Sequence, residues 1–285
     1  PTLGAKNGLT LASMIGKDFD DPEWDTLLDQ LTYSEMVNTI TLGFHNTAAA
    51  ASIGKTATKD ENGPQGLTAA LTGGASAMCY TSEDVMAATF NVDLINEVGR
   101  CIGEDCLAMG YSGLYGPGIN MHRTAYSGRN FEYYSEDPFV AGTICAAEVQ
   151  GIQSKGVYVY LKHVALNDSE TSRRGVNTWL NEQTAREIYL EVADKAITDG
   201  GAWSVMTGFN RWGATWCGAN ANLLTGFLRG ELGMRGMCIT DFSGSSQYMD
   251  LVDGLIAGSD IWDSPMPKIH TTKAANYEND AYIVT

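Results

Sequence analysis

Three predicted strands of this chain end in side chains that could do chemistry. The apolar run GVYVYL leads into Lys162 and His163, AWSVM leads to Phe209 and Asn210, and MCIT ends at Asp241. Strand ends of this kind suit the face of a βα barrel where the carboxyl ends of the strands meet. A carboxylate placed there could act as a nucleophile, and a neighbouring lysine and histidine could hold polar groups of a substrate.

Each of these residues also has a structural interpretation. An aspartate after a strand is commonly a helix cap or a turn former, which applies to Asp241. Lys162 alone is typical of a solvated strand end, and His163 alone is typical of a structural histidine. Their joint appearance at separate strand ends gives the functional interpretation about the same weight as the structural one.

A long polar and aromatic stretch, HRTAYSGRNFEYYSEDP, occupies residues 122–138. Long loops in compact domains are usually functional or disordered, and this one is too aromatic for disorder. Arg129 could bind hydroxyls or a carboxylate in its planar fork. It could also form a salt bridge with Glu132 or Asp137 that merely holds the loop, and both roles are compatible.

Apolar strand-like runs alternate with amphipathic helices along most of the chain. A capping box at Thr32 and Glu35 predicts a helix start. Further helices are expected over residues 93–110, 138–154, 181–198 and 222–232. This alternation indicates an α/β fold with parallel strands, and the pattern alone allows an open doubly wound sheet or a closed barrel. No GxGxxG follows a strand, which counts against a dinucleotide site.

The composition restricts the partners. The chain has 285 residues, 44% of them hydrophobic, and a formal net charge of -16. Nucleic acid and anionic membranes would repel such a chain, so we expect neither as a partner and a neutral substrate instead. No signal peptide is visible at the N-terminus, so a cytoplasmic location is favoured without being decided. The six cysteines lack metal spacing and are expected mostly as small buried apolar residues.

Four segments carry a family resemblance. In order, GPGINMHRTAYSGRNFEYYSEDPFVAG, KHVALNDSET, SVMTGFN and ITDFSG resemble the catalytic barrel of family 3 glycoside hydrolases of the β-glucosidase type. The similarity runs from about Leu31 to Asp263. It implies a TIM-like (β/α)8 barrel, with room for one irregular strand. The expected organisation is a leading segment or linker over 1–30, the barrel over 31–265, and a polar tail or linker stub over 266–285.

The resemblance also implies roles for individual residues. Asp241 matches the catalytic nucleophile. The positions that match sugar-binding or pocket-lining residues are Asn62, Arg129, Lys162, His163, Met206, Phe209 and Phe242. The substrate would be a carbohydrate with a terminal β-D-glucosyl or related residue, hydrolysed with retention through a glycosyl-aspartate intermediate. No cofactor and no metal are implied.

The chemistry agrees with this assignment. A retaining glycosidase needs a carboxylate nucleophile and a carboxylic acid roughly 5–5.5 Å apart across the glycosidic bond. The nucleophile must be ionised, so a nearby cation such as Lys162 would help to keep the pKa of Asp241 low. Phe242 or Trp262 could form an apolar wall beside the sugar, although core packing is the favoured role of Trp262.

Three departures from the family pattern matter. Asn62 stands where an aspartate usually binds sugar hydroxyls, and Asp60 is a candidate to compensate. Phe209 stands where many members have a tyrosine beside the nucleophile. The general acid/base glutamate usually comes from a second, α/β sandwich domain, so we expect that domain on a missing or separate part. The stretch DFDDPEWDTLLDQL resembles the subgroup with reversed domain order. KHVALNDSET lacks the second histidine of the N-acetylglucosaminidase branch, and no glutamate of the chain is assigned as the acid.

Two other functions remain to be separated from hydrolysis. A Schiff-base lyase could use Lys162 as its amine, because a lysine at a strand end suits that chemistry. A barrel that binds sugar without turnover would result if the acid/base domain is absent, and Asn62 favours this alternative. Borohydride trapping and a comparison of binding with hydrolysis discriminate these hypotheses.

Overall fold

A curled sheet of six strands forms the centre of the computed structural model, which describes residues 2–244, 246 and 248–266. Its order is β1 (Asn46–Thr47), β2 (Thr58–Asn62), β3 (Gly113–Tyr115), β4 (Tyr158–Val164), β6 (Ser204–Thr207) and β9 (Cys238–Thr240). β1 runs antiparallel to β2, and every other neighbouring pair is parallel. The carboxyl ends of β2, β3, β4, β6 and β9 therefore meet at one edge.

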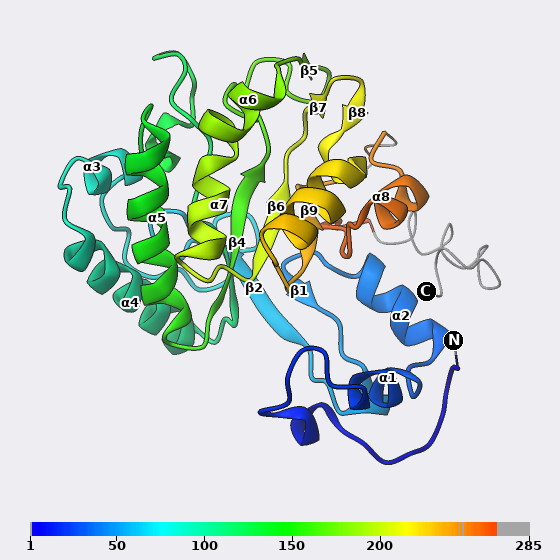
Figure 1. The fold of residues 1–285 in the computed structure, drawn as a ribbon. Coiled ribbons are helices and arrows are strands. Elements are labelled where there is room, and N and C mark those ends of the chain that lie inside the picture. Colours follow the sequence, from blue (N-terminus) through cyan, green and yellow to red (C-terminus); the bar gives the residue numbers. More distant parts are fainter. Residues whose placement is uncertain (1, 245, 247, 267–285) are drawn as a thin grey trace.

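Helices cover the outer face of this sheet (Figure 1). They include α3 (Glu83–Ala87), α4 (Val92–Met109), α5 (Pro138–Gln153), α7 (Glu191–Thr198) and the π-helical segment η6 (Asn222–Glu231). Their apolar faces and the outward side chains of the strands share one large core. The α/β arrangement and the TIM-like barrel fold are confirmed, here with a sheet that curls through about half a barrel.

Local sequence signals explain where these helices begin and end. The Asn91 side chain accepts a hydrogen bond from the Leu94 amide at 3.0 Å, and Gly110 closes α4 in the left-handed region. Asp137 caps α5, with Pro138 in the first turn. The capping box of Thr32 starts α2 (Tyr33–Thr41), as expected.

The helix expected over 181–198 is interrupted. It begins as α6 (Glu182–Thr184), widens into the π-helical turn η4 (Ala185–Tyr189) and continues as α7. The Leu190 amide bonds to the Ala185 carbonyl, five residues back, at 2.9 Å. This extra residue in the turn places both Ala185 and Leu190 in the core.

Segments beside the two ends of the sheet meet each other. Ile261 pairs with β9 as an isolated parallel bridge, and the Trp262 amide bonds to the Ile40 carbonyl near β1 at 2.8 Å. Gly43 permits this approach, because a Cβ there would lie 2.0 Å from the Ile261 side chain. Side chains from β3, β4, β6, β9 and the Ile261 segment meet inside the curl: Tyr115, Tyr160, Met206, Ile239 and Ile261.

Two helices meet without intervening side chains. A Cβ at Gly99 of α4 would lie 2.3 Å from the Glu148 carbonyl oxygen of α5. A Cβ at Gly151 of α5 would lie 2.2 Å from the Asn96 carbonyl oxygen of α4. The α4–α5 contact therefore depends on glycine at both positions.

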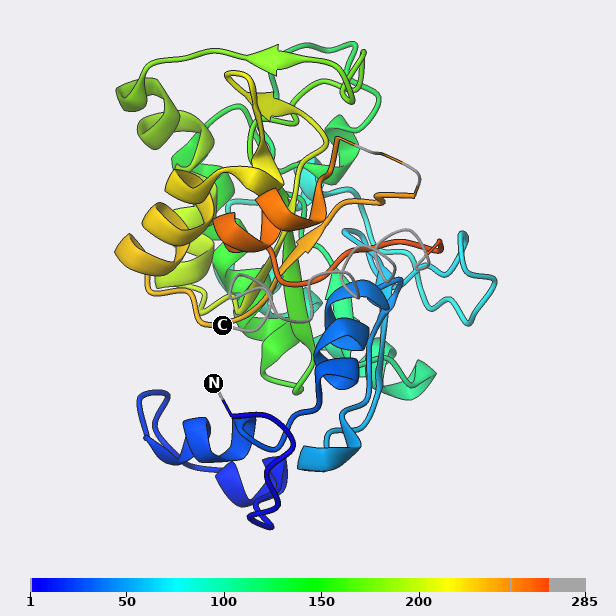
Figure 2. The ribbon, with the colours of Figure 1, turned by 90° about the vertical axis from the view of Figure 1, so that its right-hand side faces the viewer.

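Two smaller units flank the barrel at opposite ends (Figure 2). Beyond the carboxyl edge lies a sheet of β5 (Asn177–Thr178), β7 (Arg211–Trp212) and β8 (Thr215–Trp216). At the other end, residues before α2 include α1 (Glu23–Leu28) and the short 3₁₀ turn η1 (Leu11–Met14), which share a small core with the turn η2 (Ala51–Ile53). The domain boundaries at 30 and 265 stay a prediction, and most of the expected tail, 267–285, lies outside the described residues.

Trp262 packs in a core with Val37, Trp216 and Leu251, the last in α8 (Leu251–Ala257), which confirms the structural role favoured for it. Four of the six cysteines are buried and all six are free thiols. Among the described residues, no helix has the length and apolarity needed to cross a bilayer.

Candidate active site

A cavity of about 570 Å³ opens at the carboxyl edge of the sheet. It is lined by all eight residues singled out in the sequence: Asn62, Arg129, Lys162, His163, Met206, Phe209, Asp241 and Phe242. They come from the ends of β2, β4, β6 and β9 and from the turn η3 (Asn130–Glu132) with its preceding residue. Residues spread over 180 positions of the chain thus share one cavity because the parallel strands end together.

Asp241 follows β9 and is fixed by its backbone. Its amide donates to the Thr207 carbonyl at 3.2 Å, and its Oδ1 accepts a hydrogen bond from the Phe242 amide at 2.7 Å. Its Oδ2 has no hydrogen-bond partner among the described residues. One carboxylate oxygen is therefore held, while the other is buried beside His163 without a hydrogen-bond partner among the described residues.

His163 lies beside Asp241, and its hydrogen bonds define its protonation. The Asn120 side chain donates to the His163 carbonyl at 2.9 Å, so its oxygen faces His163 Nδ1 at 3.2 Å. This arrangement assigns the ring proton to Nδ1 and leaves Nε2 to accept from Arg129 Nη1 at 3.2 Å. Burial, together with the charges of Arg129 and Lys162, lowers the pKa of His163 well below its usual value.

The neutral imidazole therefore does not donate to Asp241. Its Nε2 lies 3.4 Å from Asp241 Oδ2. With the proton on Nδ1, this contact is no ion pair, which agrees with the unpartnered state of Oδ2 among the described residues.

Glu132 organises the cations of the cavity. Arg129 binds it through both ends of its fork, with Nε to Oε1 at 2.8 Å and Nη2 to Oε2 at 2.5 Å. Lys162 Nζ lies 3.8 Å from Glu132 Oε2. The loop interpretation of Arg129 is thus confirmed through Glu132 rather than Asp137, whose side chain caps α5. Burial lowers the pKa of Lys162, while Glu132 opposes that change.

The electrostatics of Asp241 differ from the expectation. Burial raises the pKa of Asp241 above its ordinary value, and the cations only reduce this effect. Arg129 and Arg173 lower the pKa more than Lys162 does. The arginines, rather than the lysine named from the sequence, are therefore the main charges that favour ionised Asp241.

Apolar side chains form part of the wall. Met206 and Phe209 are almost fully buried, whereas Phe242 is exposed and meets Phe44 edge to face, with ring centroids 6.1 Å apart. The Arg173 guanidinium lies 4.3 Å from the Phe209 ring centroid. Phe209 thus holds a cation over the cavity by a cation–π contact.

Asp60 does not take the place of an aspartate at position 62. It is buried, accepts hydrogen bonds from the Tyr158 and Tyr160 hydroxyls at 2.5 and 3.2 Å, and does not line the cavity. Burial raises the pKa of Asp60 to about 6. Asn62 itself lies within 3.4 Å of Glu61 Oε1 through its side-chain nitrogen.

The sequence interpretation missed several lining residues: His45, Gln65, Tyr115, Phe131, Arg173, Arg174 and Asp263. Only Ser172 separates the quoted segment KHVALNDSET from Arg173 and Arg174, so their proximity to it was the available signal. Asp263 follows the apolar pair of Ile261 and Trp262, much as Asp241 follows MCIT. No comparable signal marked His45.

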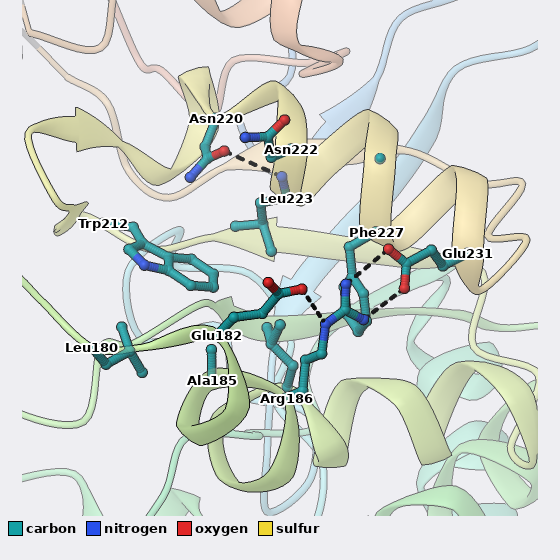
Figure 3. A pocket seen from close by; sticks show the side chains of 12 residues that line it. Leu180, Glu182, Ala185, Arg186, Trp212, Asn220, Asn222, Leu223, Phe227 and Glu231 are labelled. Carbon is teal, nitrogen blue, oxygen red and sulfur yellow. Dashed lines mark hydrogen bonds and ion pairs between the residues drawn. The ribbon is translucent and has the colours of Figure 1, made fainter.

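Another hollow, of about 510 Å³, lies on the outer surface between α6–η4 and η6 (Figure 3). Arg186 crosses it and binds Glu231 through two nitrogens at 2.6 and 2.9 Å and Glu182 at 2.9 Å. Trp212 and Phe227 supply apolar wall. Its charged groups are already paired with one another, and it contains none of the eight predicted residues, so the cavity at the strand ends is the candidate active site.

Within the described part of the chain, no group of three histidine, cysteine or acidic residues is arranged to hold a metal ion. The charged and titratable side chains that line the cavity include carboxylates, arginines, a lysine and histidines.

Comparison with known proteins decides the family. Residues 40–261 match the family model described as the glycosyl hydrolase family 3 N terminal domain. The chain belongs to this family. The resemblance seen in the four sequence segments is thus confirmed at the level of the family.

Curated relatives of the chain include several named β-glucosidases. The chain is 34% identical over 240 residues to a β-glucosidase of Rhizobium radiobacter, which covers 83% of this chain and 29% of that protein. It is 34% identical over 253 residues to thermostable β-glucosidase B of Acetivibrio thermocellus, covering 86% and 33%. An exo-α-(1→6)-L-arabinopyranosidase of Bifidobacterium longum is 34% identical over 190 residues, covering 64% and 25%.

Solved structures agree with the fold. A family 3 β-glucosidase of Bifidobacterium adolescentis superposes with a TM-score of 0.81 at 29% identity, over 89% of this chain and 37% of that one. β-Glucosidase 3B of Thermotoga neapolitana, solved in complex with glucose, gives a TM-score of 0.80 at 28% identity, over 91% and 41%. The chain spans about a third of the length of the curated relatives it matches.

Proposed function

We propose that this chain carries the nucleophile half of the active site of a retaining glycosidase that releases terminal β-D-glucosyl or related residues. Asp241 Oδ2 would attack the anomeric carbon, the bond from that carbon to the leaving oxygen would break, and water would later hydrolyse the glycosyl ester. The observation that carries this proposal is the position of Asp241 in the cavity wall. Its Oδ1 accepts a hydrogen bond from the Phe242 amide, and its Oδ2 has no hydrogen-bond partner among the described residues.

The charge balance of the cavity supports a neutral sugar. Four cations and four carboxylates line it: Arg129, Lys162, Arg173 and Arg174, and Glu132, Glu170, Asp241 and Asp263. The donors can bind sugar oxygens, and charge-assisted hydrogen bonds of this kind orient a ring and tighten in the transition state. The named activities of the relatives support glucose first and a pentopyranose as a related alternative.

The general acid/base is proposed to come from outside the described cavity, from an α/β sandwich domain on another part or another chain. Glu132 is bound by Arg129, and Glu170 lies 2.9 Å from Arg173, so both glutamates serve as partners of arginine. The greater length of the relatives is consistent with this arrangement.

The pairing of both cavity glutamates with arginines also favours a second candidate, a barrel that binds sugar without turnover. Both candidates share the sugar site and differ in hydrolysis. Family membership counts against the Schiff-base lyase, and an absence of borohydride-trapped adduct with carbonyl substrates would remove it.

The test is intact-mass spectrometry after incubation with a 2-deoxy-2-fluoro-β-glucoside that carries a dinitrophenolate leaving group. This leaving group departs with its electron pair and needs no proton, so the measurement isolates the nucleophile. We expect a stable mass gain of one fluoroglycosyl group in the natural chain and in Asp60→Asn, and none in Asp241→Asn.

The outcomes separate the candidates. Labelling that persists undiminished in Asp241→Asn refutes the assignment of the nucleophile. Labelling without hydrolysis of ordinary β-glucosides supports the barrel that lacks its acid. Sugar binding with no labelling supports the non-catalytic candidate, and neither binding nor labelling refutes both.

A further inference from the structure

Asp263 lies at the strand-end position next to Asp241 around the barrel. Ile261 pairs with Ile239 of β9 in a parallel bridge. Asp263 lies two residues after Ile261, just as Asp241 lies two residues after Ile239. Its amide donates to Thr240 Oγ1 at 3.0 Å, and its carbonyl accepts from the Ser243 amide at 2.8 Å. The backbone is thus held on both sides, and the side chain lines the cavity.

One oxygen of the Asp263 carboxylate, Oδ1, lacks a donor among the described residues, while a hydrogen bond from the His45 backbone amide to the carboxylate lowers its pKa. The residue is 3% exposed, and its Oδ1 makes no hydrogen bond with any described residue. Burial raises the pKa of Asp263 to about 7, His45 lowers it, and Asp241 adds to the increase. A buried acceptor without a donor is costly, so a ligand that donates a hydrogen bond explains its retention in the cavity.

Nearby groups leave this oxygen to a ligand. His45 Nδ1 is directed to Glu61 Oε1 at 2.9 Å, and the His45 amide approaches the Tyr115 hydroxyl at 3.1 Å. The arginine fork at Arg129 is occupied by Glu132. Asp263 therefore brings to the cavity wall a buried acceptor that no described residue satisfies.

We propose that Asp263 accepts a hydrogen bond from one hydroxyl of the bound sugar and so determines which sugar the cavity takes. This inference rests on the proposed function and adds a specificity residue to it. The preferred ligand is a neutral sugar with a free hydroxyl at that position. A uronic acid or sugar phosphate that placed its anion there would be repelled.

The experiment measures dissociation constants by calorimetry, for glucose and for its 2-, 3-, 4- and 6-deoxy analogues, with the natural chain and with Asp263→Asn. We expect Asp263→Asn to weaken glucose binding about 10- to 100-fold, the usual range for a hydrogen bond to a charged group. For the deoxy sugar that lacks the hydroxyl bound by Asp263, the two proteins should have about equal dissociation constants. Asp60→Asn is the matched control, since Asp60 is buried nearby but outside the cavity, and it should bind glucose like the natural chain.

Two results overturn the inference. One is equal glucose affinity in Asp263→Asn and the natural chain. The other is an equal loss of affinity for every deoxy sugar, which indicates a purely structural role. Binding that follows the inference while the fluoroglucoside fails to label the natural chain would refute turnover alone, and labelling with equal affinities would refute the role of Asp263 alone.

Discussion

Two buried glutamates predict an unusual pH dependence of stability. Glu83 of α3 accepts a hydrogen bond from the Gly118 amide at 3.1 Å, and Glu148 of α5 accepts one from the Tyr134 hydroxyl at 2.6 Å. Glu83 Oε2 and Glu148 Oε1 have no partner among the described residues. Burial raises the pKa of both carboxyls, that of Glu148 to about 7, and the charge of Glu148 raises the pKa of Glu83 further.

The direction in which stability changes with pH follows from proton binding. Between the unfolded pKa of 4.5 and the folded pKa of about 7, the folded state keeps a proton on Glu148 that the unfolded state releases. The contribution to stability is therefore fully present below pH 4.5 and is lost as the pH rises through 7. The difference of about 2.5 pKa units, 7 minus 4.5, corresponds to a loss on the order of 3 kcal/mol in the free energy of unfolding.

Glu148→Gln tests this reasoning, because glutamine keeps an acceptor for Tyr134 and cannot titrate. The assay is urea unfolding followed by tryptophan fluorescence at pH 5 and pH 8. We expect the variant to gain stability relative to the natural chain at pH 8 and to gain little at pH 5. Glu97→Gln, at a side chain that is 64% exposed on α4, is the control and should leave the pH slope unchanged. Equal pH slopes in Glu148→Gln and the natural chain would refute the reasoning.

Two further predictions concern charged partners. Although partial burial acts in the opposite direction, the Ser52 and Thr32 amides lower the pKa of Glu35 to about 2. The stabilisation by ionised Glu35 is present above pH 4.5 and is lost as the pH falls through 2. Glu35→Gln should therefore lower the free energy of unfolding by about 1 kcal/mol at pH 7 and by less near pH 2, measured by urea unfolding. An equal decrease at both pH values would contradict this. Arg129→Lys loses the two-point contact with Glu132 and should slow fluoroglucoside labelling at least about 10-fold, measured by time-resolved mass spectrometry. An unchanged labelling rate would show that the fork is dispensable.

The elements that position the site could be predicted because their signals are local. A capping box at Thr32, an Asp-Pro pair at the start of α5 and apolar runs that end in charge each act within a few residues. The segments that resemble the family then indicated which of the charged residues at strand ends belong to one site. All eight residues chosen on that basis line one cavity, and their individual roles stay predictions.

The features of the fold and the site that could not be predicted depend mainly on contacts between distant segments. His45 and Asp263 enter the cavity because the sheet curls until Ile261 meets Gly43, and no local pattern encodes that contact. The π-helical turn at Ala185 shifts one hydrogen bond by a single residue, which the helical period of the sequence does not reveal. The proton position on His163 depends on the amide of Asn120, a residue 43 positions away.

The glycine contact between α4 and α5 gives a route by which a remote substitution could alter the reaction. The start of α5 is anchored by Asp137, next to the loop that carries Arg129, and its end leads into β4 with Lys162. A methyl group at Gly151 would force α5 away from α4 and move both cations relative to Asp241. If the Gly151→Ala chain folds but is labelled more slowly, the cause would be a shift of α5 and of the residues it positions. Every reacting group would still be chemically intact.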